Sequence, residues 1–161
     1  MTDQEIRRLL ENQRAYYRSG ATIPVDFRIE QLKRLYRAVK KYEDEIGDAL
    51  KTDLGKSHYE GFMCESGLAL SEISYMIRNT RRFAKRRTVH TPLAQFASHS
   101  YCQPVPYGNT LIMSPWNYPF LLTIDPLADA IAAGNTAIVK PSAYSPATSV
   151  VIEKILTECF P

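Results

Sequence analysis

The sequence predicts an α/β fold in which a helical N-terminal half precedes the first strands of a parallel sheet. Two observations lead to this prediction. Over residues 1–85 the apolar residues recur with helical spacing, and after residue 108 two short apolar runs alternate with two helical segments. The order strand, helix, strand, helix is typical of parallel strands joined by crossover helices. The sequence stops where the next strand is expected, so we expect an α/β unit that is incomplete at its C-terminus.

Three helices are predicted in the first half. Residues 2–19 open with a capping-box pattern, Thr2 followed by Glu5, and Gly20 ends the helix. Residues 29–50 keep apolar residues at helical spacing, and we expect a break near Gly47. A second capping-box signature at residues 57–60 opens a third helix that extends to about residue 85.

The second half alternates between strands and helices. Residues 89–106 contain β-forming residues and three prolines, which suits edge strands or strands that pair between subunits. Residues 110–113 and 136–139 are short apolar runs that predict buried strands. The helix at residues 120–133 is expected to have Pro119 in its first turn, and the helix at residues 145–159 to have Ser145 as its N-cap.

Composition excludes several classes of protein. Hydrophobic residues make up 45% and charged residues 23% of the 161 residues, close to the average of soluble globular proteins, which excludes a disordered or fibrous chain. No apolar stretch approaches the roughly 20 residues of a membrane-spanning helix, and the polar N-terminus does not resemble a signal peptide. We therefore expect a cytoplasmic protein without a membrane span in this segment.

Metal and nucleic-acid binding are also disfavoured. The three cysteines, Cys64, Cys102 and Cys159, are widely spaced and predict neither disulfides nor a zinc site, and the three histidines are dispersed. Six basic residues lie between positions 78 and 87, which admits a nucleic-acid patch. We prefer a solvated helix end, because cations suit the negative end of a helix dipole.

Two segments follow the carboxyl ends of the predicted strands, where nucleotides bind to such sheets. The glycine fingerprint G-x-G-x-x-G is absent, which disfavours a standard dinucleotide site. Residues 114–120 instead offer the indole of Trp116 and the amide of Asn117, and residues 140–144 offer the ammonium group of Lys140. Each residue also has a purely structural interpretation: Trp116 in the core, Asn117 as a helix cap, Lys140 in solvent.

Taken together, residues 113–120 (Met-Ser-Pro-Trp-Asn-Tyr-Pro-Phe) and 130–142 (Ala-Ile-Ala-Ala-Gly-Asn-Thr-Ala-Ile-Val-Lys-Pro-Ser) closely resemble the aldehyde dehydrogenase superfamily. Residues 53–56 (Asp-Leu-Gly-Lys) and 91–94 (Thr-Pro-Leu-Ala) are similar to its class III-like branch, which includes fatty and aromatic aldehyde dehydrogenases. The resemblance covers essentially the whole chain, but only about the first third of a family member.

The resemblance implies a Rossmann-like fold and a division of the chain. Residues 1–88 would be the helical lead-in of the cofactor domain, 89–107 part of the oligomerisation hairpin, and 108–161 the first β-α-β-α part of the NAD(P)-binding domain. The catalytic domain would be absent. A homodimer, an aldehyde substrate and the cofactor NAD or NADP are implied as partners.

The resemblance also assigns roles to residues. Asn117 would be the catalytic amide of the oxyanion hole. Cofactor binding would involve Ser114, Pro115 and Trp116 as a wall against the cofactor, and Lys140 at the adenosine ribose. Ala143 stands where the family often has Glu, a carboxylate that would repel a 2′-phosphate.

One departure from the family limits the expected function. The family oxidises aldehydes to carboxylic acids through a cysteine thiolate and a glutamate that lie beyond residue 161, and none of the three cysteines of this chain matches the nucleophile. We therefore expect the chain alone to be inactive. Alternatives are another superfamily member, such as a coniferyl or succinate semialdehyde type, and a shortened non-catalytic homologue that binds a nucleotide or a partner subunit.

Overall fold

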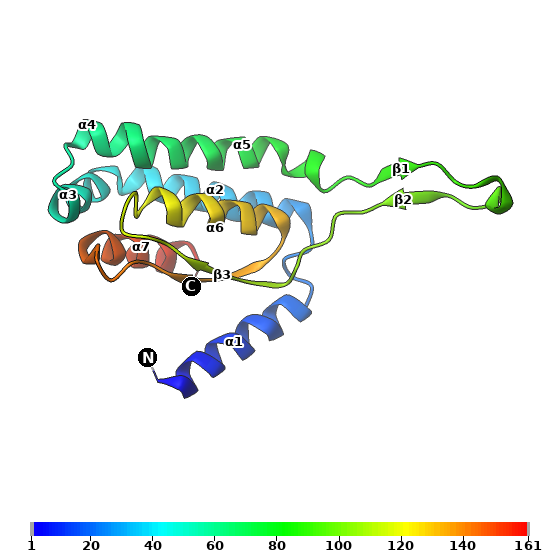
Figure 1. Cartoon of the computed structure of the whole chain (residues 1–161), viewed down its shortest axis with the longest axis horizontal. Coiled ribbons are helices and arrows are strands. Elements are labelled where there is room, and N and C mark those ends of the chain that lie inside the picture. The colour runs from blue at the N-terminus through cyan, green and yellow to red at the C-terminus, as the bar shows by residue number, and fades with distance from the viewer. Residues whose placement is uncertain (1, 161) are drawn as a thin grey trace.

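The computed structural model describes residues 2–160 and confirms a helical N-terminal half followed by parallel strands (Figure 1). Seven α-helices and four strands occur within this range: α1 (Asp3–Arg18), α2 (Val25–Lys41), α3 (Glu43–Leu54), α4 (His58–Gly61), α5 (Gly67–Phe83), β1 (Arg87–Val89), β2 (Ser100–Cys102), β3 (Asn109–Met113), α6 (Leu121–Ala133), β4 (Thr136–Lys140) and α7 (Pro146–Cys159). Among the described residues, no helix is both long and apolar enough to cross a membrane.

The first helices differ from the sequence prediction at one point. The capping box at α1 is confirmed, because the Thr2 side chain accepts from the Glu5 amide and Glu5 accepts from the Thr2 amide. The predicted break near Gly47 is wrong: α2 ends at Lys41, and Tyr42, with φ −100° and ψ 17°, separates it from α3. Gly47 lies inside α3, where a Cβ would come within 2.7 Å of the His58 ring.

The third predicted helix is interrupted by a π-helical turn, η1 (Phe62–Ser66), between α4 and α5. Here the amide of Gly67 donates to the carbonyl of Phe62, five residues earlier, instead of four. A Cβ at position 67 would lie 2.7 Å from that same carbonyl oxygen, so the turn requires a glycine there. The basic residues at the end of α5 are exposed, as expected for a solvated helix end.

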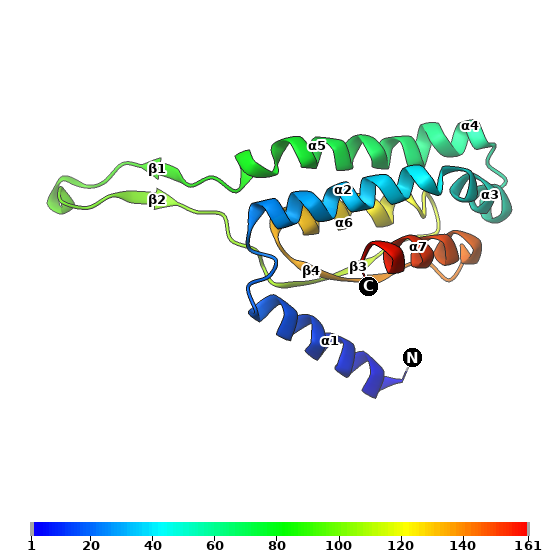
Figure 2. The ribbon, with the colours of Figure 1, turned by 180° about the vertical axis from the view of Figure 1, so that it is seen from behind.

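The core lies where α2, α3, α5, α6 and α7 meet. Its fully buried members are large aliphatic and aromatic side chains: Leu32, Leu35, Val39, Ile46, Leu50, Ile73, Phe120, Ile124, Ile152 and Ile155. In both views α2, α5 and α6 lie on one side of β3 and β4, and α1 lies on the other (Figures 1 and 2). The helices therefore cover one face of the strands more completely than the other.

The two parallel strands are less buried than the sequence predicted. β3 and β4 pair in parallel, and α6 connects them, as expected. Only Ile112 of β3 is buried, whereas Leu111 and Met113 are 62% and 66% exposed. Burial of β3 on both faces is thus a wrong prediction for the described residues, because α1 covers one face of β3 only loosely and leaves Leu111 and Met113 exposed.

The segment after α5 forms a projecting arm. β1 and β2 pair antiparallel, with Arg87 opposite Cys102 and Val89 opposite Ser100. The arm extends away from the helices (Figure 1), and Leu93 and Phe96 near its tip are each 85% exposed. The sequence predicts strands within residues 89–106, and the structure shows that β1 and β2 pair antiparallel within the one chain.

Helix α6 begins at Leu121, two residues later than the predicted first turn at Pro119. Its C-terminus is capped from a distant helix: the guanidinium of Arg28 donates to the carbonyls of Ala132 and Ala133, at 3.3 and 3.1 Å. Burial lowers the pKa of Arg28 from its usual value. Gly134 has φ +86°, and a Cβ there would lie 2.6 Å from the Arg28 guanidinium carbon.

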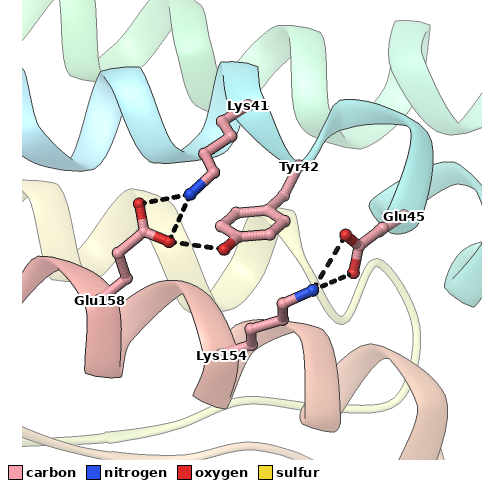
Figure 3. A network of polar contacts seen from close by, with 5 residues as sticks. All are labelled: Lys41, Tyr42, Glu45, Lys154 and Glu158. Carbon is pink, nitrogen blue, oxygen red and sulfur yellow. Dashed lines mark hydrogen bonds and ion pairs between the residues drawn. The ribbon is translucent and has the colours of Figure 1, made fainter.

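Helix α7 is attached to α2 and α3 by a surface network (Figure 3). Lys41 donates to Glu158 at 2.7 Å, and the Tyr42 hydroxyl donates to the same carboxylate at 2.5 Å. Lys154 donates to Glu45 at 2.7 Å, and the ammonium groups of Lys41 and Lys154 lie 4.9 and 4.6 Å from the centre of the Tyr42 ring. The hydrogen bonds from Lys41 and Tyr42 hold the pKa of Glu158 below its ordinary value.

Candidate functional site

The carboxyl ends of β3 and β4 lie side by side. The strands are in register, with Met113 opposite Lys140, and the amide of Ser114 donates to the carbonyl of Lys140 at 3.3 Å. The segments 114–120 and 140–145 therefore leave the sheet from the same edge. This is the edge at which ligands bind in open α/β sheets.

The first segment is held at its two ends. Ser114 is buried, and its hydroxyl lies 2.6 Å from that of Thr123 on α6. The Thr123 hydroxyl also lies 2.6 Å from the carbonyl oxygen of Pro119. Thr123 is itself fully buried, so one side chain of α6 ties the beginning of the loop to its end.

Between these ends the loop is open to solvent. Pro115, Trp116 and Asn117 are exposed, with Trp116 at 56%. The interpretation of Trp116 as a core residue is therefore wrong for the described chain. Asn117 is not a helix cap either, because α6 begins at Leu121 and its N-cap position is Phe120. No hydrogen bond within residues 2–160 occupies the Asn117 amide, which leaves its donors available to a ligand.

The end of the loop is fixed by a buried ion pair that the sequence did not reveal. The carboxylate of Glu65, in the π-helical turn, accepts from the amides of Phe120 and Leu121 at 2.8 and 3.3 Å. Its other oxygen accepts from Lys56 at 2.5 Å. The ammonium group of Lys56 also lies 4.1 Å from the centre of the Tyr118 ring. Lys56 ends the Asp-Leu-Gly-Lys segment that resembles the family, and no local sequence pattern indicates a role for Glu65.

The second segment is a compact turn after β4. Ser142 is buried, and its hydroxyl accepts from the amide of Tyr144 at 3.1 Å while its carbonyl accepts from the Ser149 hydroxyl at 3.0 Å. Lys140 and Ala143 are exposed on this turn, and the Lys140 ammonium group donates to the Pro141 carbonyl at 3.0 Å. A charge at position 140 and a small side chain at 143 therefore face solvent at the sheet edge.

Carboxylates already occupy the N-termini of the two helices at this edge. Glu65 caps α6, and Asp53 of α3 caps α7 by accepting from the amides of Ala147 and Thr148 at 3.1 and 2.7 Å. Ser145 occupies the N-cap position, as expected, but its buried hydroxyl makes no capping bond. A helix N-terminus ordinarily attracts phosphate, and neither of these two is free to bind one.

None of the cysteines is placed at this edge. Cys64 lies in the π-helical turn and is half-buried, Cys102 is exposed on β2, and Cys159 is buried at the end of α7. Burial, with a contribution from Glu158, raises the pKa of Cys159 to about 11. A thiol with so high a pKa is a poor nucleophile at neutral pH.

The comparisons with known proteins agree with this geometry. The chain is an α/β unit with polar segments at the carboxyl edge of parallel strands, and the model of the aldehyde dehydrogenase family matches residues 1–161. The chain therefore belongs to the aldehyde dehydrogenase family.

Several curated relatives are similar to this chain over most of its length. The chain is 44% identical over 147 residues to 4,4'-diaponeurosporen-aldehyde dehydrogenase of Staphylococcus aureus, covering 91% of this chain and 32% of that protein. It is 39% identical over 153 residues to aldehyde dehydrogenase family 3 member A2 of Rattus norvegicus, covering 95% and 32%. It is also 39% identical over 142 residues to the dimeric, NADP-preferring aldehyde dehydrogenase of Canis lupus familiaris, covering 88% and 31%. These relatives confirm the class III-like resemblance.

A solved structure has the same fold. The substrate-bound state of Staphylococcus aureus AldH superposes with a TM-score of 0.94 at 42% identity, covering 96% of this chain and 34% of that one. The chain thus spans about one third of the length of each of these four relatives.

Proposed function

We propose that the chain supplies the N-terminal, cofactor-side part of an NAD(P)-dependent aldehyde dehydrogenase that oxidises an aldehyde to a carboxylic acid. The observation that carries this proposal is the juxtaposition of residues 114–120 and 140–145 at one sheet edge, where the exposed Asn117 side-chain amide has no hydrogen-bond partner within residues 2–160. The family membership supports the same activity.

Asn117 is the catalytic residue in this proposal. When a thiolate attacks an aldehyde, the carbonyl oxygen becomes an alkoxide, and an amide N–H that meets this oxygen stabilises the charge. The Asn117 side chain is exposed and uses none of its donors within the described residues. A donor that is already in place need not reorganise during the reaction, which is the main source of such stabilisation.

The residues present fit the adenosine half of a dinucleotide. Lys140 supplies a cation beside the exposed turn that carries Ala143, and in this proposal Ser114, Pro115 and Trp116 would form the neighbouring wall against the cofactor. NAD or NADP, when bound, would accept the hydride of the substrate. Glu65 and Asp53 already accept from the amides at the starts of α6 and α7, so these two helix termini would not hold the pyrophosphate of a bound dinucleotide, which agrees with the absence of a glycine fingerprint.

The division of the chain follows from the same proposal. Residues 1–88 form the helical lead-in, residues 89–107 part of an oligomerisation hairpin, and residues 108–161 the first part of the cofactor domain. The projecting β1–β2 arm, with exposed Leu93 and Phe96, supports pairing with a second subunit. The name of the dimeric canine relative supports a homodimer as well.

The proposal is tested with Asn117→Ala in the complete enzyme that contains this chain. Losing one oxyanion donor typically lowers kcat about 10² to 10³-fold, and we expect the Kd for NAD(P)+ to stay nearly unchanged. A lower Tm with unchanged kcat would contradict the proposal. The 161-residue chain alone is expected to form no NAD(P)H with any aldehyde, and turnover that disappears on mutation of Cys64, Cys102 or Cys159 would contradict this expectation.

A further inference from the structure

The loop that carries Asn117 is fixed from the helical half of the chain. One contact comes from Lys56, whose ammonium group lies 4.1 Å from the centre of the Tyr118 ring, directly after Asn117. The other comes from Glu65, which accepts from the amide of Phe120 at 2.8 Å. The two side chains form an ion pair of 2.5 Å with each other, so they act on the loop as one unit.

Tyr118 shows why the loop needs such a restraint. It has φ +52°, the only positive φ of a non-glycine residue among those described. A bulky residue is rarely found in this conformation and stays there only when its surroundings hold it. The Lys56 ammonium group over the ring provides such a hold on the residue next to Asn117.

Glu65 reaches the loop because of the π-helical turn. The turn inserts an extra residue into the helix, and π-helical turns occur frequently at functional sites. The Glu65 side chain is 0% exposed and that of Lys56 is 12% exposed, so the pair is almost completely removed from water. Gly67 permits this turn, because any Cβ there would clash with the Phe62 carbonyl.

We propose that Lys56 and Glu65 are positioning residues that hold residues 115–118, and with them the Asn117 amide, in the geometry that the reaction needs. This proposal rests on the proposed role of Asn117. A buried ion pair is a poor source of stability, since desolvation offsets most of its Coulomb energy. The pair instead fixes the position of the loop, because Lys56 contacts the side chain of Tyr118 and Glu65 accepts from the backbone of Phe120.

The loop contains its own spectroscopic reporter. Trp116 is the only tryptophan of the 161 residues, and it lies beside Asn117 with 56% exposure. We expect Lys56→Gln and Glu65→Gln in the 161-residue chain to raise the acrylamide quenching constant of Trp116 about twofold and to lower its fluorescence anisotropy. Lys56→Arg, which keeps a cation that can lie over the Tyr118 ring, is expected to change both values less than Lys56→Gln does.

The matched control is Asp53→Asn. Asp53 is also a carboxylate that caps a helix at this sheet edge, but it contacts α7 and not residues 114–120. We expect Asp53→Asn to lower the Tm without changing the acrylamide quenching or the fluorescence anisotropy of Trp116. Unchanged quenching in Lys56→Gln together with a lower Tm would show that the pair only stabilises the fold. If Glu65→Gln does not fold, the Lys56→Gln result decides between the two roles, because the Lys56 side chain, unlike that of Glu65, is 12% exposed.

A kinetic experiment in the complete enzyme separates this proposal from the function itself. Misplacing a catalytic group by about 1 Å can lower the rate about 100-fold, so Lys56→Gln is expected to reduce kcat roughly 10-fold or more while KM for NAD(P)+ stays within about twofold. If Asn117→Ala leaves kcat unchanged, the proposed function fails, and the Trp116 signals still report whether the pair holds the loop. An unchanged kcat in Lys56→Gln, alongside a reduced kcat in Asn117→Ala, would overturn the positioning role.

Discussion

Replacing Asp53 by alanine tests the capping of α7 from a distant helix. The Asp53 carboxylate accepts three hydrogen bonds from the start of α7: from the amides of Ala147 and Thr148, at 3.1 and 2.7 Å, and from the Thr148 hydroxyl, at 2.7 Å. Thr148 is completely buried, so water cannot replace the lost partner of its hydroxyl.

The expected loss of stability is the sum of three contributions. Removal of an N-cap acceptor costs about 1 kcal/mol, and loss of the negative charge at the helix N-terminus costs about 0.5 kcal/mol. The unsatisfied Thr148 hydroxyl adds about 1 kcal/mol. The total of about 2.5 kcal/mol corresponds to a decrease in Tm of roughly 5 to 10 °C for a chain of this size. Asp53→Asn keeps an acceptor, so we expect its loss of unfolding free energy to be less than half of that of Asp53→Ala.

Thermal unfolding followed by far-ultraviolet circular dichroism measures the effect. Asp48→Ala is the matched control, since Asp48 also lies on α3 but makes only an exposed contact with His58. Exposed pairs contribute little, so its Tm is expected to change by less than about 2 °C. A decrease in Tm for Asp53→Ala that is no larger than for Asp48→Ala would refute the reasoning.

Three further changes test other features. Burial, with repulsion from Glu72 and Asp129, raises the pKa of Asp125 to about 6, so this group contributes a loss of stability as pH rises from about 4 to 6. Asp125→Asn should remove that contribution and raise the free energy of unfolding at pH 8, measured by urea denaturation, by about 1 kcal/mol; an unchanged pH slope would contradict the assignment. Ala143→Glu in the complete enzyme should lower the NADP+ to NAD+ ratio of kcat/KM about 10-fold by repelling the 2′-phosphate, and an unchanged ratio would contradict this. In a Cys64→Ala background, Ellman's reagent should react quickly with exposed Cys102 and about 100-fold more slowly with buried Cys159; a fast phase that survives the further change Cys102→Ala would contradict the difference in burial.

Local signals in the sequence located most elements correctly. The capping box of Thr2 and Glu5, the glycine after α6 and the apolar runs of β3 and β4 each act on neighbouring residues, so their consequences are visible in the sequence itself. The strand order also placed residues 114–120 and 140–144 at one edge, because parallel strands connected by a helix end on the same side of a sheet.

The tertiary structure alone decided how these elements are held. Glu65 caps α6 across 55 residues, Asp53 caps α7 across 95, and Arg28 caps the end of α6 across 104. Periodicity and propensity describe contacts within a few residues, whereas a charged side chain serves as a cap only where packing brings a helix end to it. For the same reason the π-helical turn and the Lys56–Glu65 pair at the Asn117 loop became visible only in the folded chain.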